Sequence, residues 1–390
     1  MRTRRGVYYP EVNKVKRRSD FQAGNDRKRS KRPPDLPGTF EFFEQLHDDL
    51  VICILSRLSA TAGSPADNIN VLLTCKRFHA LAQHPEVLKN ASAKMLAVKA
   101  KNWCDSAHEF MKRCIRAGSL EACYTLGMIR FYCLRKRKSG LALLIKASMA
   151  NHVDSLYSLA VIQFNGSGGP KSSKDLKAGV VLCARASALG HVDAMRELGH
   201  CLQDGYGVRR DVAHGRRFLV HANARELAAV FSVSPSYLSH RTWLTWNPFP
   251  EEHTPPGSCS RCPLLSDYGC DVPRQEPHPA TRFLTEWFAA QGGSPAEGLR
   301  MCSNVACGRP ETRSNEFRRC SVCGGANYCS RACQAIDWKS RHKAVCAPAG
   351  DGYGGGNGNG NGDVNGGGNG DANDLPAQDV AMMDVDGNGD

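Results

Sequence analysis

The sequence predicts a mainly α-helical protein with a small cysteine-rich domain near its end, between two terminal segments that form no core. Three observations predict this fold class. Apolar residues recur at helical spacing over 42–90, a similar segment recurs within 118–226, and eight cysteine and histidine residues gather over 302–346. The first two patterns are typical of packed helices, and the third of a metal-bound domain too small for an ordinary core.

The two ends of the 390-residue chain are too polar to fold. The segment Arg2–Arg32 contains twelve Lys or Arg residues against three acidic ones, and residues 350–390 are mostly Gly, Asn and Asp. Such segments bury too little apolar surface to offset chain entropy, so we expect a disordered basic arm over 1–35 and a disordered tail over 348–390. The net charge of +13 therefore describes no single surface.

Two basic clusters in the arm, residues 14–18 and 27–32, have the spacing of a bipartite nuclear import signal. A solubilising or weakly phosphate-binding tail is the alternative. No apolar run approaches the roughly eighteen residues of a membrane span, and the first twenty residues are not a signal peptide. We therefore expect an intracellular, nuclear protein, with a cytoplasmic pool left open and no membrane partner.

The eighteen cysteines are then expected to be metal ligands where they cluster and small core residues where they scatter.

A first helical pattern begins near Phe42. Its apolar residues recur every four positions or lie beside those that do: Leu46, Leu50, Val51, Ile54, Leu55 and Leu58. This spacing predicts one amphipathic helix, followed by a polar loop over 59–68 and a second helical pattern from Val71 to Ala82 that stops near Pro85. Two short helices with a wide apolar face need a partner.

These helices resemble the F-box. The resemblance rests on residues 46–58, LHDDLVICILSRL, and residues 73–81, LTCKRFHAL, and covers about residues 42–90. It implies a helical face that binds the Skp-type adaptor of cullin–RING ubiquitin ligases. Two features depart from the family: His47 stands where it usually has Pro, and the loop over 59–68 is longer. The alternative is an ordinary helical cap on the next domain.

An internal repeat follows. Residues 147–156 match residues 186–195 at an offset of 39, and residues 118–127 contain an earlier, looser copy. Each unit has the size of a helix-turn-helix pair, with Leu126, Leu159 or Leu198 in the first helix and an Ala-rich second helix. Small residues let the helices of a pair approach closely, so stacked pairs predict a short α-solenoid.

Residues 198–211, LGHCLQDGYGVRRD, resemble Sel-one-like repeats, relatives of the tetratricopeptide repeats. Glycines at 205 and 207 would supply the left-handed turn after the first helix. The resemblance implies a surface for a partner protein, and a purely structural spacer is the alternative. The scattered cysteines of this region are expected to pack inside helices: Cys114, Cys123, Cys133, Cys183 and Cys201.

From 232 to 300 the periodicity fades, which predicts a linker with one helix near residues 280–291. Cys259, Cys262 and Cys270 lie in this linker as candidate ligands of a third metal or as free thiols.

The cysteine-rich segment has enough ligands for two tetrahedral Zn²⁺ ions. The eight ligands are Cys302, Cys307, Cys320, Cys323, Cys329, Cys333, His342 and Cys346. Thiolate and imidazole groups that fill all four positions leave no place for a substrate, so we expect a structural rather than a catalytic metal. The spacing of Cys329 and Cys333, and of His342 and Cys346, fits two ligands on one helix face. Trp338 lies four residues before His342 and should shield the ligands from water.

The order and spacing of these ligands resemble the MYND finger, with a first gap of four residues where the family usually has two. The resemblance implies two interleaved sites, Cys302, Cys307, Cys329 and Cys333 on one ion and Cys320, Cys323, His342 and Cys346 on the other. It also implies binding of short proline-containing peptides. We expect chelation to unfold this segment alone.

The cations near the ligands in sequence are expected to balance the charge of the zinc sites: Arg318, Arg319, Lys339, Arg341 and Lys343. Without a recognition helix or stacking aromatic residues, we do not expect them to bind nucleic acid.

The whole chain resembles a plant family of F-box proteins with MYND fingers, over about residues 40–347. We expect six segments: the arm 1–35, F-box-like helices 36–95, Sel-one-like repeats 96–231, the linker 232–300, the finger 301–347 and the tail 348–390. The resemblance implies a non-catalytic substrate receptor of a ubiquitin ligase whose repeats and finger bind the target. The alternative is a nuclear scaffold or corepressor adaptor that binds proline-containing peptides through the finger.

Overall fold

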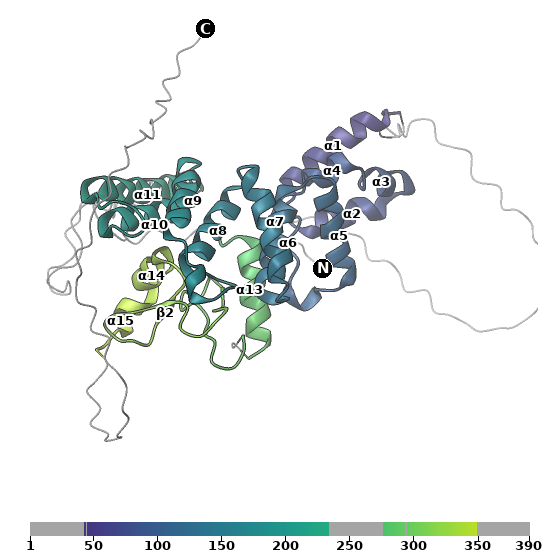
Figure 1. Ribbon diagram of the computed structural model, residues 1–390. Coiled ribbons are helices and arrows are strands. Elements are labelled where there is room, and N and C mark those ends of the chain that lie inside the picture. The colour runs from purple at the N-terminus through teal and green to yellow at the C-terminus, as the bar shows by residue number, and fades with distance from the viewer. Residues whose placement is uncertain (1–42, 44, 234–275, 293–294, 349–390) are drawn as a thin grey trace, which may run out of the picture.

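The computed structural model describes residues 43, 45–233, 276–292 and 295–348, which form a row of helices with the finger and one later helix packed along one side (Figure 1). At one end of the row lie four short helices: α1 (Asp48–Thr61), α2 (Pro65–Thr74), α3 (Lys76–Leu81) and α4 (Pro85–Lys89). Their small core contains Val51, Leu55, Ala82 and Val87.

The loop expected over 59–68 is shorter in the structure, because α1 continues to Thr61 and α2 begins at Pro65. Ser64 and Asp67 form a capping box, in which the Asp67 carboxylate accepts from the backbone N–H of Ser64 at 3.1 Å. Proline at the first helical position already has the φ angle that a helix needs. The polar residues therefore start a helix rather than form a loop.

The helical pattern expected over 71–82 is likewise divided between α2 and α3. Cys75 has an extended backbone, with a φ angle of −156°, and its sulfur accepts from the Phe78 backbone N–H at 3.4 Å. A cysteine can thus act as the N-cap of a new helix, a role more usual for Ser, Thr, Asn or Asp.

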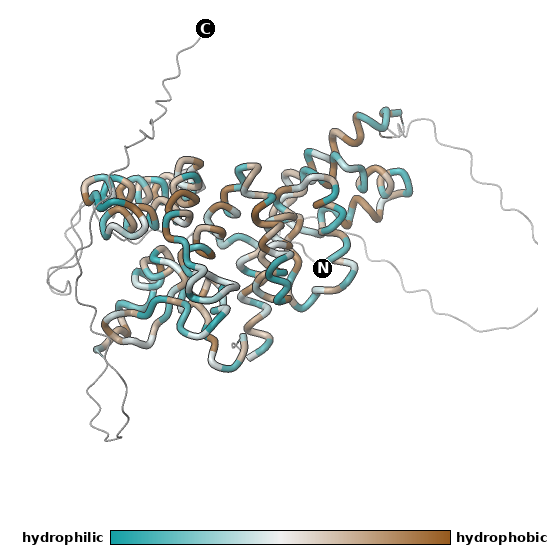
Figure 2. The backbone as a smooth tube through the Cα atoms, viewed as in Figure 1, coloured by the Kyte–Doolittle hydropathy of each residue, from teal (hydrophilic) through white to brown (hydrophobic). Residues whose placement is uncertain are grey.

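The internal repeat is confirmed as three stacked helix pairs, preceded by η1 (Ala100–Asn102) and α5 (Asp105–Arg116). In the first pair, α6 (Leu120–Met128) continues into the π-helical turn η2 (Ile129–Cys133) and packs against α7 (Arg137–Met149). The second pair is α8 (Val153–Asn165) with α9 (Leu176–Ala188). The third pair is α10 (Val192–Asp204) with α11 (Val212–Val233). The short segment η3 (Lys171–Ser173) joins the second pair. In Figure 2 hydropathy alternates along these helices, as expected where each buries one face.

Small residues allow the close helix contacts that the sequence predicts. A Cβ atom at Gly215 in α11 would lie 2.6 Å from the Gly199 carbonyl oxygen of α10. Gly205 and Gly207 follow α10 with φ angles of +71° and +74°, and a Cβ at Gly207 would lie 2.6 Å from the Leu176 carbonyl oxygen. The glycines after α10 therefore have the left-handed conformation expected of them.

The scattered cysteines are packed helix residues, as predicted. Cys114, Cys123, Cys183 and Cys201 are buried and Cys133 is half-buried. Burial raises the pKa of Cys114 to about 12, so its thiol stays protonated and behaves as a small apolar group.

The helix expected near 280–291 is α13 (Pro279–Ala290), and it packs against α6, η1 and η2. Phe283, Leu284 and Phe288 are buried, and Phe283 and Leu284 share a core with Tyr124, Leu126 and Ile129 of the first repeat. This part of the expected linker is thus an integral element of the repeat core. Within the described residues, no helix is long and apolar enough to cross a bilayer.

The finger, residues 302–346, contains little regular structure. Its strands β1 (Arg318–Arg319) and β2 (Asn327–Tyr328) pair antiparallel, with Arg318 opposite Tyr328, and are followed by α14 (Arg331–Asp337), η6 (Trp338–His342) and α15 (Lys343–Val345). Cysteines of the finger belong to one hydrophobic core with residues of α8, α9 and α10. The finger therefore folds against the repeats rather than apart from them.

Candidate metal centre

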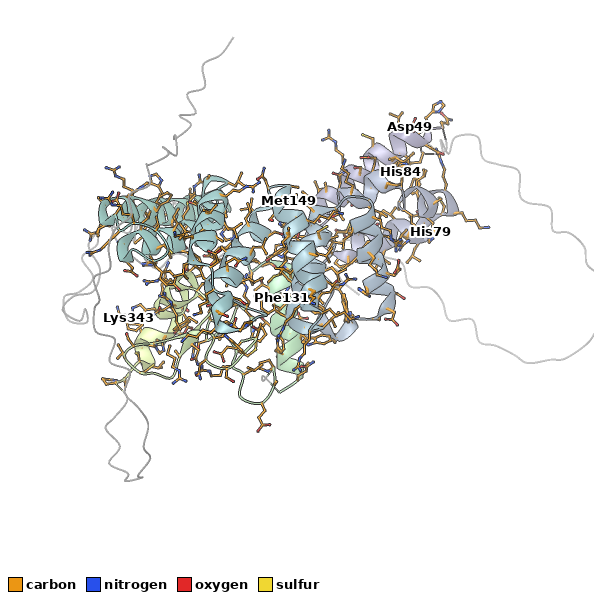
Figure 3. All side chains as sticks on the ribbon, in the orientation of Figure 1. Asp49, His79, His84, Phe131, Met149 and Lys343 are labelled. Atoms are coloured by element: carbon orange, nitrogen blue, oxygen red, sulfur yellow. The ribbon has the colours of Figure 1, made fainter. Side chains whose placement is uncertain are left out.

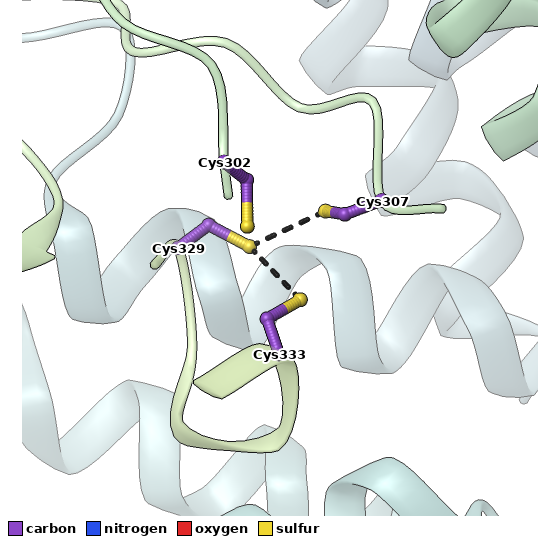
Figure 4. Close-up of side chains that lie close together, drawn as sticks. All are labelled: Cys302, Cys307, Cys329 and Cys333. Carbon is purple, nitrogen blue, oxygen red and sulfur yellow. Dashed lines mark hydrogen bonds between the residues drawn. The ribbon is translucent and has the colours of Figure 1, made fainter. Parts of the chain in front are cut away.

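Four buried cysteines from separate parts of the finger meet at one point, Cys302, Cys307, Cys329 and Cys333 (Figure 4). The Sγ atom of Cys329 lies 3.5 Å from that of Cys307 and 3.6 Å from that of Cys333. These four residues form what we call site 1.

The second group, which we call site 2, consists of Cys320, Cys323, His342 and Cys346. The Sγ atoms of Cys320 and Cys346 are 3.8 Å apart, and the Sγ atom of Cys323 lies 3.5 Å from His342 Nε2. Trp338 packs edge-on beside His342, with ring centroids 5.8 Å apart, as its position in the sequence predicts. Cys323 and Cys346 are only half-buried.

Both groups fit Zn²⁺. A tetrahedral ion with Zn–S bonds of about 2.3 Å separates its sulfur ligands by about 3.8 Å, close to the distances in both sites. The structure thus brings together the two ligand sets that the MYND resemblance implies. With four protein ligands each, both sites have the composition of closed structural zinc sites.

The strand β2 and the N-cap of α14 position two ligands of site 1. Cys329 directly follows β2, and Ser330 has an extended backbone and caps α14 by accepting from the Cys333 backbone N–H at 3.1 Å. Cys333 is thereby fixed in the first turn of α14. The expectation that Cys329 and Cys333 lie on one helix face is wrong, because the extended residue Ser330 separates Cys329 from the helix.

Site 2 differs from the expectation as well. His342 ends the π-helical turn η6, whereas Cys346 lies just beyond α15 in an extended conformation. The histidine and the cysteine therefore approach the same point from two different local structures.

The nearest cation to the thiols of site 1 is Arg309, which sequence reasoning did not single out. Its side chain is buried, with 6% of the residue exposed; Nη1 donates to Cys307 Sγ at 3.6 Å and Nη2 donates to Ser158 Oγ at 3.0 Å. Burial lowers the pKa of Arg309, but the charge interactions with the sulfurs of Cys307 and Cys329 outweigh that effect and hold its pKa well above the ordinary value.

Several of the cations expected to balance the zinc charge contact other groups. Arg318 lies over the Tyr206 ring at 4.4 Å, Lys339 pairs with Glu226 at 3.9 Å, and Arg341 pairs with Asp337 at 3.1 Å. Nearness in sequence was a poor guide here, because these side chains point toward the repeats or along their own helix. The signal that the sequence offered for Arg309 was its position two residues after the ligand Cys307, and its burial is seen only in the structure.

The fold and the site together define a helical-repeat protein that carries a two-site MYND finger. Comparison with known families agrees: residues 302–346 match the MYND finger, and residues 93–180 match plant tetratrico peptide repeats. Zinc is therefore the cofactor that both sites are built to hold.

The particular family follows from two relatives in Arabidopsis thaliana. The chain is 57% identical over 338 residues to F-box protein At1g67340, which covers 84% of this chain and 88% of that protein. It is 56% identical over 306 residues to F-box protein At5g50450, with coverage of 78% and 85%. The chain belongs to this family of plant F-box proteins with tetratricopeptide-related repeats and a MYND finger.

Among solved structures, a Sel1 repeat protein from Oxalobacter formigenes is similar, with 18% identity, a TM-score of 0.28 and coverage of 30% of this chain and 89% of that one. The basic clusters of the arm and the candidate third metal site at Cys259, Cys262 and Cys270 lie outside the described residues.

Proposed function

We propose that this chain is the substrate-recognition subunit of a Skp–cullin–F-box ubiquitin ligase, in which α1 and α2 bind the Skp-type adaptor and the repeats and finger bind the target. Its relatives and its helical repeats support a non-enzymatic adaptor. Closed zinc sites agree with this, because neither leaves a position for substrate.

The observation that carries the proposal is the division of apolar residues on α1. Val51 and Leu55 face the small core and are 1% and 5% exposed, whereas Leu50, Ile54 and Leu58 are 54%, 46% and 38% exposed. Leu50, Ile54 and Leu58 therefore keep a large part of their apolar surface uncovered by this chain. A row of exposed large apolar side chains on one helix face is typical of a surface that a partner covers.

The neighbouring helix also carries exposed apolar residues. Ile69 and Leu73 of α2, four residues apart, are 49% and 77% exposed. Together with the row on α1 they give two adjacent helices with uncovered apolar residues, which suits a helical partner.

His47 stands where the F-box usually has proline, but the backbone at this position still has the conformation that a proline would have. His47 has a φ angle of −59°, which lies in the range that proline fixes, so the residue typical of the F-box would fit at the same place. Arg77 of α3 holds the start of α1 by pairing with Asp48 at 2.7 Å and donating to the Phe43 carbonyl at 2.6 Å. The helix start is therefore fixed without the proline.

A double substitution tests the adaptor role. Leu50→Asp with Leu58→Asp places two charges on the exposed row, and we expect it to abolish co-purification of the Skp-type adaptor, because burying unpaired carboxylates costs several kcal/mol. The matched control is Ile145→Asp with Met149→Asp, since these α7 residues are also four apart and exposed, at 43% and 75%.

Figure 3 shows Met149 well apart from Asp49 at the start of α1. The control should therefore bind the adaptor like the unaltered chain. Equal adaptor recovery from both double variants, with circular dichroism unchanged, would refute the proposal and favour the scaffold alternative.

For the target, the repeats and the finger border a shared cavity of about 970 Å³. Its walls include Asp154 and His191 from the starts of α8 and α10, Arg225 of α11, His278 before α13, and Ile336 of the finger. A concave site with both apolar and charged groups, formed where two modules meet, is a common place for ligand binding. We propose that a peptide of the target enters here.

Nuclear localisation remains a proposal that rests on the two basic clusters of the arm. A fluorescent fusion that lacks residues 1–35 should lose nuclear enrichment, and continued nuclear accumulation would refute the signal.

A further inference from the structure

The polar contacts between the finger and the repeats form two groups. Thr312, Arg313 and Glu316 contact the turn after α8, and a second group lies around site 1. Asn165 of α8 donates to the carbonyl oxygen of the ligand Cys329 at 2.8 Å. Tyr157 of the same helix donates to Ser330 Oγ at 3.2 Å. Helix α8 therefore holds the stretch that joins the ligands Cys329 and Cys333.

Helix α10 holds the same stretch from another direction. The Glu197 carboxylate, 4% exposed, accepts from the backbone N–H groups of Arg331 and Ala332 at 2.8 Å and 3.1 Å. Arg331 also pairs with Asp204 at the end of α10. If the finger moved away, the buried carboxylate of Glu197 would lose both backbone donors.

Arg309 adds a buried charge to this interface, directly beside site 1. The guanidinium lies between Cys307 Sγ and Ser158 Oγ of α8 and also faces the Tyr157 ring at 6.0 Å. Among the described residues, Arg309 forms no ion pair with a carboxylate, and the charged groups that act on it most strongly are the sulfurs of Cys307 and Cys329. A buried cation without a counter-charge is strongly unfavourable, and four thiolates on one Zn²⁺ carry a formal charge of about −2.

Site 2 lacks these connections. Among the residues that the structure describes, hydrogen bonds join none of its ligands, Cys320, Cys323, His342 and Cys346, to a repeat helix. Two of its cysteines, Cys323 and Cys346, are half-buried. The cysteines of site 2 do share the hydrophobic core with the repeats, so the two metal sites differ in their hydrogen bonds to the repeats.

We propose that the Zn²⁺ ion of site 1 holds the finger on α8 and α10, with Arg309 as the positioning residue that links the charge of the ion to the interface, whereas site 2 stabilises only the finger. Metal binding at site 1 and docking of the finger are then one coupled equilibrium, and each strengthens the other equally. This proposal differs from the expectation that chelation unfolds the finger alone, and the experiments below distinguish the two. It also makes one wall of the shared cavity dependent on zinc, whether or not the chain serves a ligase.

Matched ligand variants of the full chain test the coupling. Cys307→Ser removes a ligand of site 1 and Cys323→Ser removes a ligand of site 2, and native mass spectrometry counts the ions retained. We expect amide hydrogen exchange in α8 and α10 to rise by at least about tenfold in Cys307→Ser. In Cys323→Ser the increase should be confined to residues 318–346. Protected α8 and α10 in Cys307→Ser, or an equal increase in both variants, would overturn the proposal.

Stepwise chelation of the unaltered chain gives an independent test, should Cys307→Ser be insoluble. The first ion to leave should be that of half-exposed site 2, with α8 and α10 still protected. Exchange in these helices should rise only with loss of the second ion. A rise that accompanies the first loss would refute the assignment to site 1.

Arg309→Met tests the charge link, because Met keeps an unbranched chain of similar reach without the charge. Removing a residue that supports a metal ligand typically weakens metal binding by about 10- to 100-fold, and we expect a loss of this size at site 1 in competition with a chelator. Unchanged release from site 1 would remove Arg309 from the mechanism. Arg319→Met is the control, since this exposed finger arginine contacts Asn315 rather than a thiol.

Discussion

Phe283 of α13 tests whether this part of the chain belongs to the repeat core. The side chain is 2% exposed and its ring lies 5.4 Å from that of Trp103, edge-on, and 5.8 Å from that of Trp287, stacked. A phenylalanine buries at least about 150 Å², which at about 25 cal/mol per Å² is worth nearly 4 kcal/mol. With the cavity left behind, Phe283→Ala should lower the free energy of unfolding by about 3–5 kcal/mol.

Thermal and denaturant unfolding of the full chain, with zinc present, would measure this loss. A change of this size corresponds to a fall of roughly 6–20 °C in the melting temperature of a domain of about 200 residues. Arg282→Ala is the control on the same helix, since this exposed residue pairs with exposed Glu276 and should change stability by at most about 0.5 kcal/mol. If the two variants had the same melting temperature, α13 would be a helix of the linker that the sequence predicts, outside the repeat core.

Two further predictions concern pH and the cavity. Burial, with help from Arg331 and Arg196, lowers the pKa of His200 to about 4, so the unfolded chain binds the proton between pH 6.5 and 4 and stability falls as the pH drops. Between pH 7 and 5 the unaltered chain should lose about 2 kcal/mol more than His200→Gln in denaturant titrations, and parallel losses would contradict this. Asp193→Arg reverses a charge in the cavity wall and should weaken target capture about tenfold or more in proximity labelling with proteasome inhibition, with adaptor binding unchanged. Asp105→Arg, also an acid in the first turn of its helix, is the control, and equal target capture by both would exclude the cavity.

The periodic parts of the fold could be predicted from the sequence because each repeat signals its own helices. Buried leucines and close glycines recur with the unit, so their role follows from spacing alone. The first residues of α2 and α3 were harder to predict, because a single capping residue decides each of them. Ser64 caps α2 and Cys75 caps α3. Helix α13 was expected, but its packing was not, because the residues that bury Phe283 lie about 160 positions earlier in the chain.

The zinc ligands could be predicted because cysteine and histidine residues at these spacings are typical of structural zinc sites. Their environment could not, because it depends on which repeat helix the finger meets. Arg309 shows the difference: its neighbours in sequence are finger residues, whereas its partner Ser158 lies 151 positions earlier in α8. Nearness along the chain pointed to cations such as Arg318 and Lys339. It missed Arg309, whose side chain contacts a ligand in space.

Three repeats form a short row that leaves one side of its helices to be covered. In this chain α13 covers α6, and the finger covers α8 and α10, through the two hydrophobic cores that they share with the repeats. Short repeat arrays need such capping, because end units have no neighbour to bury their apolar faces. A partner therefore cannot use the whole of that side, and within the part of the chain that the structure describes, the cavity between the starts of α8, α10 and α13 is accessible. In the function proposed above, the recognition surface is then composite, and the proposed role of site 1 makes its shape depend on zinc as well as on the repeats.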